Sequence, residues 1–104
     1  MSKVFGKEPS MNLYKTILEL KDLDECYRFF QDLCTVSELR AMEQRFDVAV
    51  LLQKGMIYND ILEQTGASSA TISRVNRSLN YGTDTYRILF ERLRADEDAP
   101  EEQL

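Results

Sequence analysis

The sequence predicts an all-α fold, a helical bundle, and three observations support this prediction. Apolar residues recur at intervals of three and four through almost the whole chain, which is the spacing of amphipathic helices. Helix start and stop signals separate these stripes, and two prolines and four glycines leave few loops. With 104 residues, 43% of them apolar, the chain can bury one small core. We therefore expect a single helical domain over residues 1–95.

Two short amphipathic helices are expected first. One apolar stripe runs from Met11 to Leu18 and the next from Leu23 to Cys34, and Asp22 is suited to cap the second helix. The stripes consist of Met11, Tyr14, Ile17 and Leu18, and of Leu23, Tyr27, Phe29, Phe30, Leu33 and Cys34. These side chains are expected to form scaffold rather than a site for chemistry.

A long helix follows and should reach Gln53. Thr35-Val36-Ser37-Glu38 is a capping box, in which the first and last side chains each satisfy an N–H group at the helix start. Gly55 can end the helix. Residues Val48 to Leu52 are apolar on every side, and such a segment must be surrounded. Because one short chain has little material for this, we infer that a second subunit supplies part of the cover.

Residues 57–80 have the pattern of a DNA-binding helix-turn-helix. A short helix from Asn59 to Gln64 meets the turn Thr65-Gly66-Ala67, and a second helix over residues 69–79 opens at Ser68-Ser69. Glycine adopts the left-handed backbone of such a turn at least cost, and a serine can cap the next helix. The second helix should place Ile72, Val75 and Leu79 inward.

The outward face of this second helix suits the floor of a major groove. It consists of small and basic residues, Ala70, Ser73, Arg74 and Arg77. The chain has no acidic residue between Glu63 and Asp84. An ordinary αα-corner in a helical bundle is the alternative reading, and the absence of acid favours DNA. Arg77 and Lys54 are candidates for contacts with phosphate.

The last helix should run from about Asp84 to Arg94, and an acidic disordered tail is expected over residues 96–104. The helix places Tyr86, Leu89, Phe90 and Leu93 on one face. The tail holds five acidic residues and no basic one, so it accounts for the whole net charge of −5. Because affinity for phosphate follows the local patch, the acidic average does not exclude a nucleic-acid partner.

Several function classes are disfavoured. The chain has no histidine, which removes the commonest general base and the usual catalytic triads, so we expect no enzyme. Cys26 and Cys34 form no C-x-x-C pair and are expected to be buried reduced thiols, and we expect no metal or cofactor. Neither a membrane-spanning run of about 20 residues nor a signal peptide is evident, so a cytoplasmic location is expected.

The run from Thr35 to Leu93 resembles the Trp repressor family, and within it the YerC/YecD-type branch. The long helix ends in LLQKG, and the second motif helix reads ATISRVNRSL. This resemblance implies a Trp repressor-like bundle that forms an intertwined homodimer, whose two helix-turn-helix units face successive major grooves, as those of the Trp repressor do. It also implies contacts with bases or phosphates at Ser69, Ala70, Thr71 and Ser73.

The resemblance further implies a candidate effector pocket for tryptophan. Arg74 matches the family's arginine that holds the amino-acid carboxylate, and Thr71 and Ser78 match positions beside the pocket. Two positions depart from the family. Lys54 replaces an arginine that stacks on the indole, and Val75 replaces a glycine. We therefore expect DNA binding without tryptophan, with a small amino-acid-like effector left open and with Arg74 as an alternative phosphate contact.

Together these observations predict a repressor-like transcriptional regulator that binds specific double-stranded DNA sequences. The predicted DNA-binding residues are Ser69, Ala70, Thr71, Ser73, Arg74, Arg77 and Lys54. The candidate effector pocket consists of Lys54, Thr71, Arg74, Val75 and Ser78. The alternative function is a protein-interaction module that uses the same face of the same fold. Salt separates the two, since DNA binding weakens steeply with ionic strength.

Overall fold

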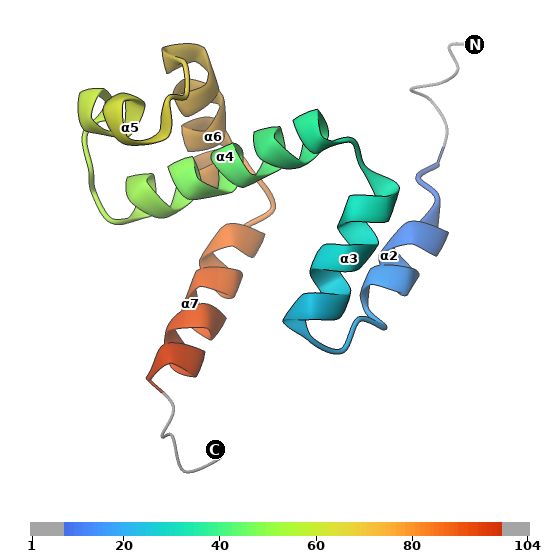
Figure 1. Cartoon of the computed structure of the whole chain (residues 1–104). Coiled ribbons are helices and arrows are strands. Elements are labelled where there is room, and N and C mark those ends of the chain that lie inside the picture. Colours follow the sequence, from blue (N-terminus) through green and yellow to red (C-terminus); the bar gives the residue numbers. More distant parts are fainter. Residues whose placement is uncertain (1–7, 99–104) are drawn as a thin grey trace. The chain divides into compact units, whose positions relative to one another are not determined.

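In a computed structural model of the chain, which describes residues 8–98, the polypeptide forms six α-helices and no strand over this range (Figure 1). The helices are α2 (Met11–Ile17), α3 (Leu23–Leu33), α4 (Val36–Gln53), α5 (Tyr58–Thr65), α6 (Ser69–Tyr81) and α7 (Thr85–Glu97). The all-α prediction is therefore confirmed for this part of the chain. None of these helices has the length and apolar character needed to cross a membrane.

The helix starts follow the predicted caps. The Asp22 carboxylate accepts a hydrogen bond of 2.8 Å from the Glu25 N–H at the start of α3. Before α4, the Glu38 N–H donates to the Thr35 hydroxyl at 3.1 Å, and the Thr35 N–H donates to the Glu38 carboxylate at 2.8 Å. The bond from the Thr35 backbone lowers the pKa of Glu38. The capping box is confirmed.

Contacts among the described residues define two compact units, the first ending at Leu39 and the second beginning at Arg40. A single domain over residues 1–95 stays a prediction. In the first unit, α2 and α3 bury no side chain completely. Leu18 and Leu23 are 83% and 85% exposed. Cys26 and Cys34 are free thiols, as predicted, but they are half-buried rather than buried.

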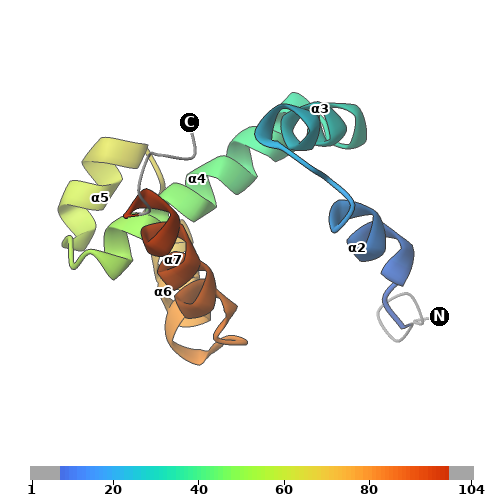
Figure 2. The same ribbon diagram turned by 90° about the horizontal axis from the view of Figure 1, so that it is seen from below.

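The core of the second unit lies around the C-terminal half of α4. Its buried side chains are Val48, Ala49, Ile61, Ala67, Ile72, Val75 and Phe90. Val50, Leu51 and Leu52 are partly buried against this core. Figures 1 and 2 show α5, α6 and α7 arranged around this half of α4. Helices of the same chain thus cover much of Val48 to Leu52, the part of α4 that is apolar on every side.

An aromatic cluster joins α4 to α7 within the second unit. The ring centroid of Phe46 lies 6.3 Å from that of Tyr86 and 5.8 Å from that of Phe90. Helix α7 continues to Glu97, so the first two residues assigned to the acidic tail, Asp96 and Glu97, belong to the helix. Asp98 caps the helix, and the predicted tail from residue 99 onward lies outside the described residues.

Candidate nucleic-acid interface

The turn between α5 and α6 has the backbone that the sequence predicts. Gly66 caps α5 with a left-handed φ of 73°, and its N–H donates to the Leu62 carbonyl at 2.9 Å. No atom lies within 4 Å of the place where a Cβ would stand. The backbone conformation, rather than a lack of space, therefore explains the glycine.

Side chains near the turn hold it to the rest of the second unit. The Thr65 hydroxyl donates to the Ile61 carbonyl at 2.7 Å and accepts from the Ala67 N–H at 3.1 Å. The amide of Gln44, on α4, donates to the Thr65 carbonyl at 3.1 Å. Sequence reasoning did not identify Gln44, because it lies 21 residues before its partner and no local spacing relates the two.

Helix α6 begins at Ser68, whose hydroxyl accepts from the Thr71 N–H at 3.1 Å. The Ser68 hydroxyl also donates a hydrogen bond to the Thr71 hydroxyl at 3.1 Å. Ser68 is therefore the cap, and Ser69 is the first residue of the helix. The sequence alone does not decide which of these two serines is the cap. Thr71, predicted to contact DNA and the effector, is half-buried at this cap.

The two faces of α6 point as predicted. Ile72 is completely buried and Val75 is 3% exposed, and Leu79 packs partly buried beside them. The outward residues Ala70, Ser73, Arg74 and Arg77 are all exposed. Helix α5 packs against α6, and these four outward residues remain exposed along one face of α6.

The arginines of the second unit differ in their surroundings. Arg87 is paired with Asp84 at 2.7 Å and with Glu91 at 3.1 Å. Hydrogen bonding to Asp84 raises the pKa of Arg87, and the same bond lowers the pKa of Asp84. Within residues 8–98, Arg74, Arg77 and Lys54 have neither a hydrogen-bond nor an ion-pair partner for their side chains. Their charge remains available to an anion.

A shallow groove of about 480 Å³ lies on the same surface of α6. It is lined by Tyr58, Ser73, Asn76, Arg77 and Tyr81. Sequence reasoning missed Tyr58, Asn76 and Tyr81. Tyr58 belongs to α5, so only the packing of the two helices brings it beside Arg77. Tyr81 lies beyond the predicted end of the second motif helix, which the structure extends by two residues.

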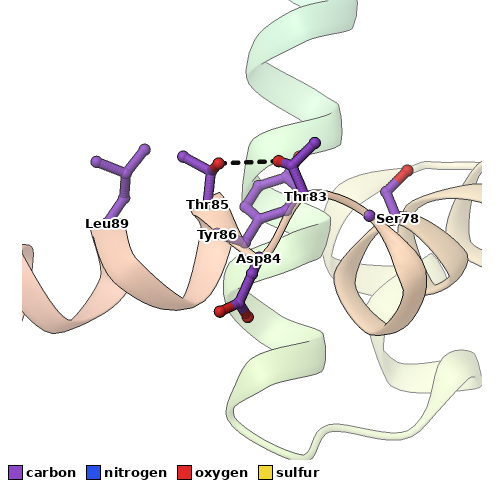
Figure 3. Close-up of a pocket in the computed structure, with 7 residues that line it drawn as sticks. Ser78, Thr83, Asp84, Thr85, Tyr86 and Leu89 are labelled. Carbon is purple, nitrogen blue, oxygen red and sulfur yellow. Dashed lines mark hydrogen bonds between the residues drawn. The ribbon is translucent and has the colours of Figure 1, made fainter.

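One of the five candidate effector residues, Ser78, lines a cavity within the second unit. A cavity of about 370 Å³ between α6 and α7 is lined by Ser78, Gly82, Thr83, Asp84, Thr85, Tyr86 and Leu89 (Figure 3). Of the five predicted residues it includes Ser78 but not Lys54, Thr71, Arg74 or Val75.

The polar groups of this cavity do not converge on a common point. The Thr83 and Thr85 hydroxyls are hydrogen-bonded to each other at 2.8 Å, and the Asp84 carboxylate points away from them in Figure 3. That carboxylate is held by Arg87 instead. Val75 is part of the buried core. Among residues 8–98 no three His, Cys, Asp or Glu residues are placed to hold a metal ion.

Proteins similar to this chain are known from sequences and from crystal structures. The family described as Trp repressor protein matches residues 10–94. The chain is 50% identical over 97 residues to the uncharacterized protein YerC of Bacillus subtilis, with 93% of this chain and 92% of YerC covered. A TrpR-like protein from Eubacterium eligens has a TM-score of 0.76 and 60% identity, covering 78% of this chain and 84% of that one. A candidate Trp repressor from Staphylococcus aureus has a TM-score of 0.80 and 41% identity, covering 90% and 95%.

Proposed function

The chain belongs to the Trp repressor family, and we propose from this that it is a homodimeric, repressor-like transcriptional regulator that binds specific sequences of double-stranded DNA. The family match and the identity to YerC confirm the resemblance predicted from the sequence, including its YerC-type branch. Its solved relatives confirm the Trp repressor-like fold. The family consists of DNA-binding regulators and not of enzymes, in agreement with the prediction drawn from the missing histidine.

The observation that most supports DNA binding is the outward face of α6. It is exposed, has no acidic residue, and presents Arg74 and Arg77 without partners among the described residues. In a helix-turn-helix the N-terminal residues of the second helix contact base edges. We assign that role to Ser69, Ala70, Thr71 and Ser73. Arg74, Arg77 and Lys54 then supply contacts to phosphate.

DNA binding is proposed to be independent of tryptophan. Val75 fills core space where the resembled family has glycine, and Lys54 lacks the flat guanidinium that stacks on an indole. Arg74 is exposed and free to contact phosphate instead. A smaller amino-acid-like effector near Thr71, Arg74 and Ser78 stays part of the hypothesis.

The proposed assembly is a dimer that acts where the DNA is, in the cytoplasm. Leu18 and Leu23 expose more than four-fifths of their surface, and other apolar side chains of α2 and α3 are exposed beside them. Monomeric proteins rarely leave so much apolar surface open to water. A second copy of the chain is the partner that the family membership favours for these helices.

Selection of duplexes from a random-sequence library tests this function. The purified chain is expected to enrich one motif, and a homodimer should enrich two half-sites related by two-fold symmetry. The double variant Arg74→Ala, Arg77→Ala serves as the control and should retain few duplexes. If the wild-type chain enriches no sequence over the starting library, sequence-specific DNA binding is wrong.

A further inference from the structure

The groove beside α6 has a chemical character of its own. Ser73, Arg77 and Tyr81 follow one another at intervals of four residues, so they form one stripe on α6, with Asn76 beside them. Tyr58, the first residue of α5, forms the opposite wall. Tyr58 is 40% exposed and Tyr81 is 84% exposed. The groove is therefore open to a large ligand along its length.

Every side chain that lines this groove can donate a hydrogen bond, and none is acidic. The Asn80 amide donates to the Asn76 side-chain oxygen at 3.2 Å and to its backbone carbonyl at 3.0 Å. Asn76 therefore presents its NH₂ group as the free half of its amide. Asp60 follows Tyr58 by two residues, which places it about 200° around α5, away from Tyr58. This set of donors suits an anion with several acceptor oxygens.

The position of the groove on the helix-turn-helix indicates which anion. Arg77 lies eight residues after Ser69, which is about 12 Å along a helix axis. A major groove is about 8.5 Å deep, so a helix whose first residues reach its floor places Arg77 at the rim, where the phosphates lie. The first helix of the motif crosses the DNA backbone, and Tyr58 begins that helix.

We propose that Tyr58, Asn76, Arg77 and Tyr81 of this groove, beside the base-contacting Ser73, hold one phosphodiester group of the DNA backbone in each half-site. Arg77 is the charged contact, Tyr58 and Asn76 donate neutral hydrogen bonds, and the exposed ring of Tyr81 packs on the adjoining sugar. The proposal depends on the DNA-binding function above and identifies three further contact residues for it. These contacts fix the register of α6 and carry no sequence information themselves.

Charged and neutral contacts to one phosphate have different signatures. With alanine in place of Arg77, one more counterion stays condensed on the bound DNA. The slope of log affinity against log salt concentration should therefore become less steep by about one per subunit. Tyr58→Phe removes only a hydroxyl and leaves that slope unchanged. We expect each change to weaken binding by about tenfold, the effect of a hydrogen bond to a charged group. The double variant should lose less than the product of the two, because both residues contact the same phosphate.

Ethylation interference locates the phosphate. Randomly ethylated copies of a duplex that the wild-type chain has enriched are bound and separated, and the phosphates whose ethylation blocks binding are read out. Of the phosphates whose ethylation blocks the wild-type chain, one per half-site should cease to block Arg77→Ala and should block Tyr58→Phe less strongly. Tyr86→Phe, on α7 and outside the groove, is the matched control and should keep the wild-type pattern. Circular dichroism melts establish that all variants fold.

The outcomes separate this proposal from the function on which it depends. A chain that binds duplexes while Tyr58→Phe and Arg77→Ala keep wild-type affinity and interference overturns the groove and leaves DNA binding intact. If Tyr58→Phe changes the preferred sequence instead of affinity for all sequences, Tyr58 contacts a base and the phosphate assignment is wrong. A wild-type chain that binds no duplex overturns both the function and the groove.

Discussion

Arg77 and Arg87 show how neighbouring side chains decide what an arginine can do. Both are exposed and both belong to the second unit. Arg87 is held by Asp84 and Glu91, which cancel its charge locally. Arg77 has Tyr58, Ser73 and the other neutral donors of the groove around it, and these leave its charge free. The basic residues near the motif are therefore not equivalent, although their sequence positions suggest a single basic set.

Glu38 gives a prediction for the pH dependence of stability. Its folded pKa is lowered, first by the hydrogen bond from the Thr35 backbone, so the ionised form stabilises the start of α4. This contribution is fully present above the unfolded pKa of about 4.3 and disappears as the pH falls through the lower folded value. We expect the Tm of the wild-type chain to fall more than that of Glu38→Gln between about pH 6 and about pH 3. Parallel melting curves at all pH values would contradict it.

At the level of the elements, short-range sequence signals are sufficient to predict the helix caps, the Gly66 turn and the buried face of α6. The caps at Asp22, Thr35 and Ser68 and the left-handed Gly66 depend on side chains within about four residues, which is why the sequence predicts them. The inward and outward faces of α6 follow from helical spacing in the same way.

The parts that the sequence does not predict depend on packing between elements. The bond from Gln44 to Thr65 and the approach of Tyr58 to Arg77 each join different helices, and no periodicity encodes them. The effector residues rest on position in the resembled family, and their role stays a prediction; Ser78 lines the cavity between α6 and α7, and the other four do not. Element ends also shifted, since α6 and α7 both extend beyond their predicted last residues.

Gly66, at the end of α5, and Gly82, at the end of α6, make different demands on a side chain. Gly66→Ala should destabilise the chain by about 1 kcal/mol, because a left-handed backbone costs that much for most residues and the space is open. Gly82→Ala should cost more, because its Cβ would run into the Ser78 carbonyl. Gly66→Asn is the control, since asparagine tolerates the left-handed region. Urea unfolding measures all three, and a Gly82→Ala variant as stable as Gly66→Ala would contradict the packing argument.

At the scale of the whole molecule, the exposed apolar side chains of α2 and α3 predict an obligate dimer. Light scattering at micromolar concentration should give about twice the chain mass of 12.1 kDa. Replacing Leu18 and Leu23 by serine should weaken the assembly, because these two side chains are largely exposed in the single chain. A compact monomer with full helical signal in the wild-type chain would rule out this assembly.

The proposed independence from tryptophan is tested by calorimetry, with the ligand at millimolar concentration and with or without DNA. The chain contains no tryptophan of its own, so fluorescence of the ligand provides a second measurement. We expect no coupling, because regulation requires a ligand that prefers one of the two states. Saturable binding that raises DNA affinity tenfold, about 1.4 kcal/mol of coupling, would make the chain a tryptophan-dependent repressor.

The central claim, that the outward face of α6 binds the DNA backbone, is tested most directly by the salt dependence of affinity for an enriched duplex. The wild-type chain should lose affinity steeply as salt rises, and the double variant Arg74→Ala, Arg77→Ala should show a log–log slope smaller by about two per subunit. Arg87→Ala is the charge-matched control and should keep the wild-type slope, because Asp84 and Glu91 already neutralise Arg87. Equal slopes and equal affinities for the wild-type chain and the double variant would contradict the claim.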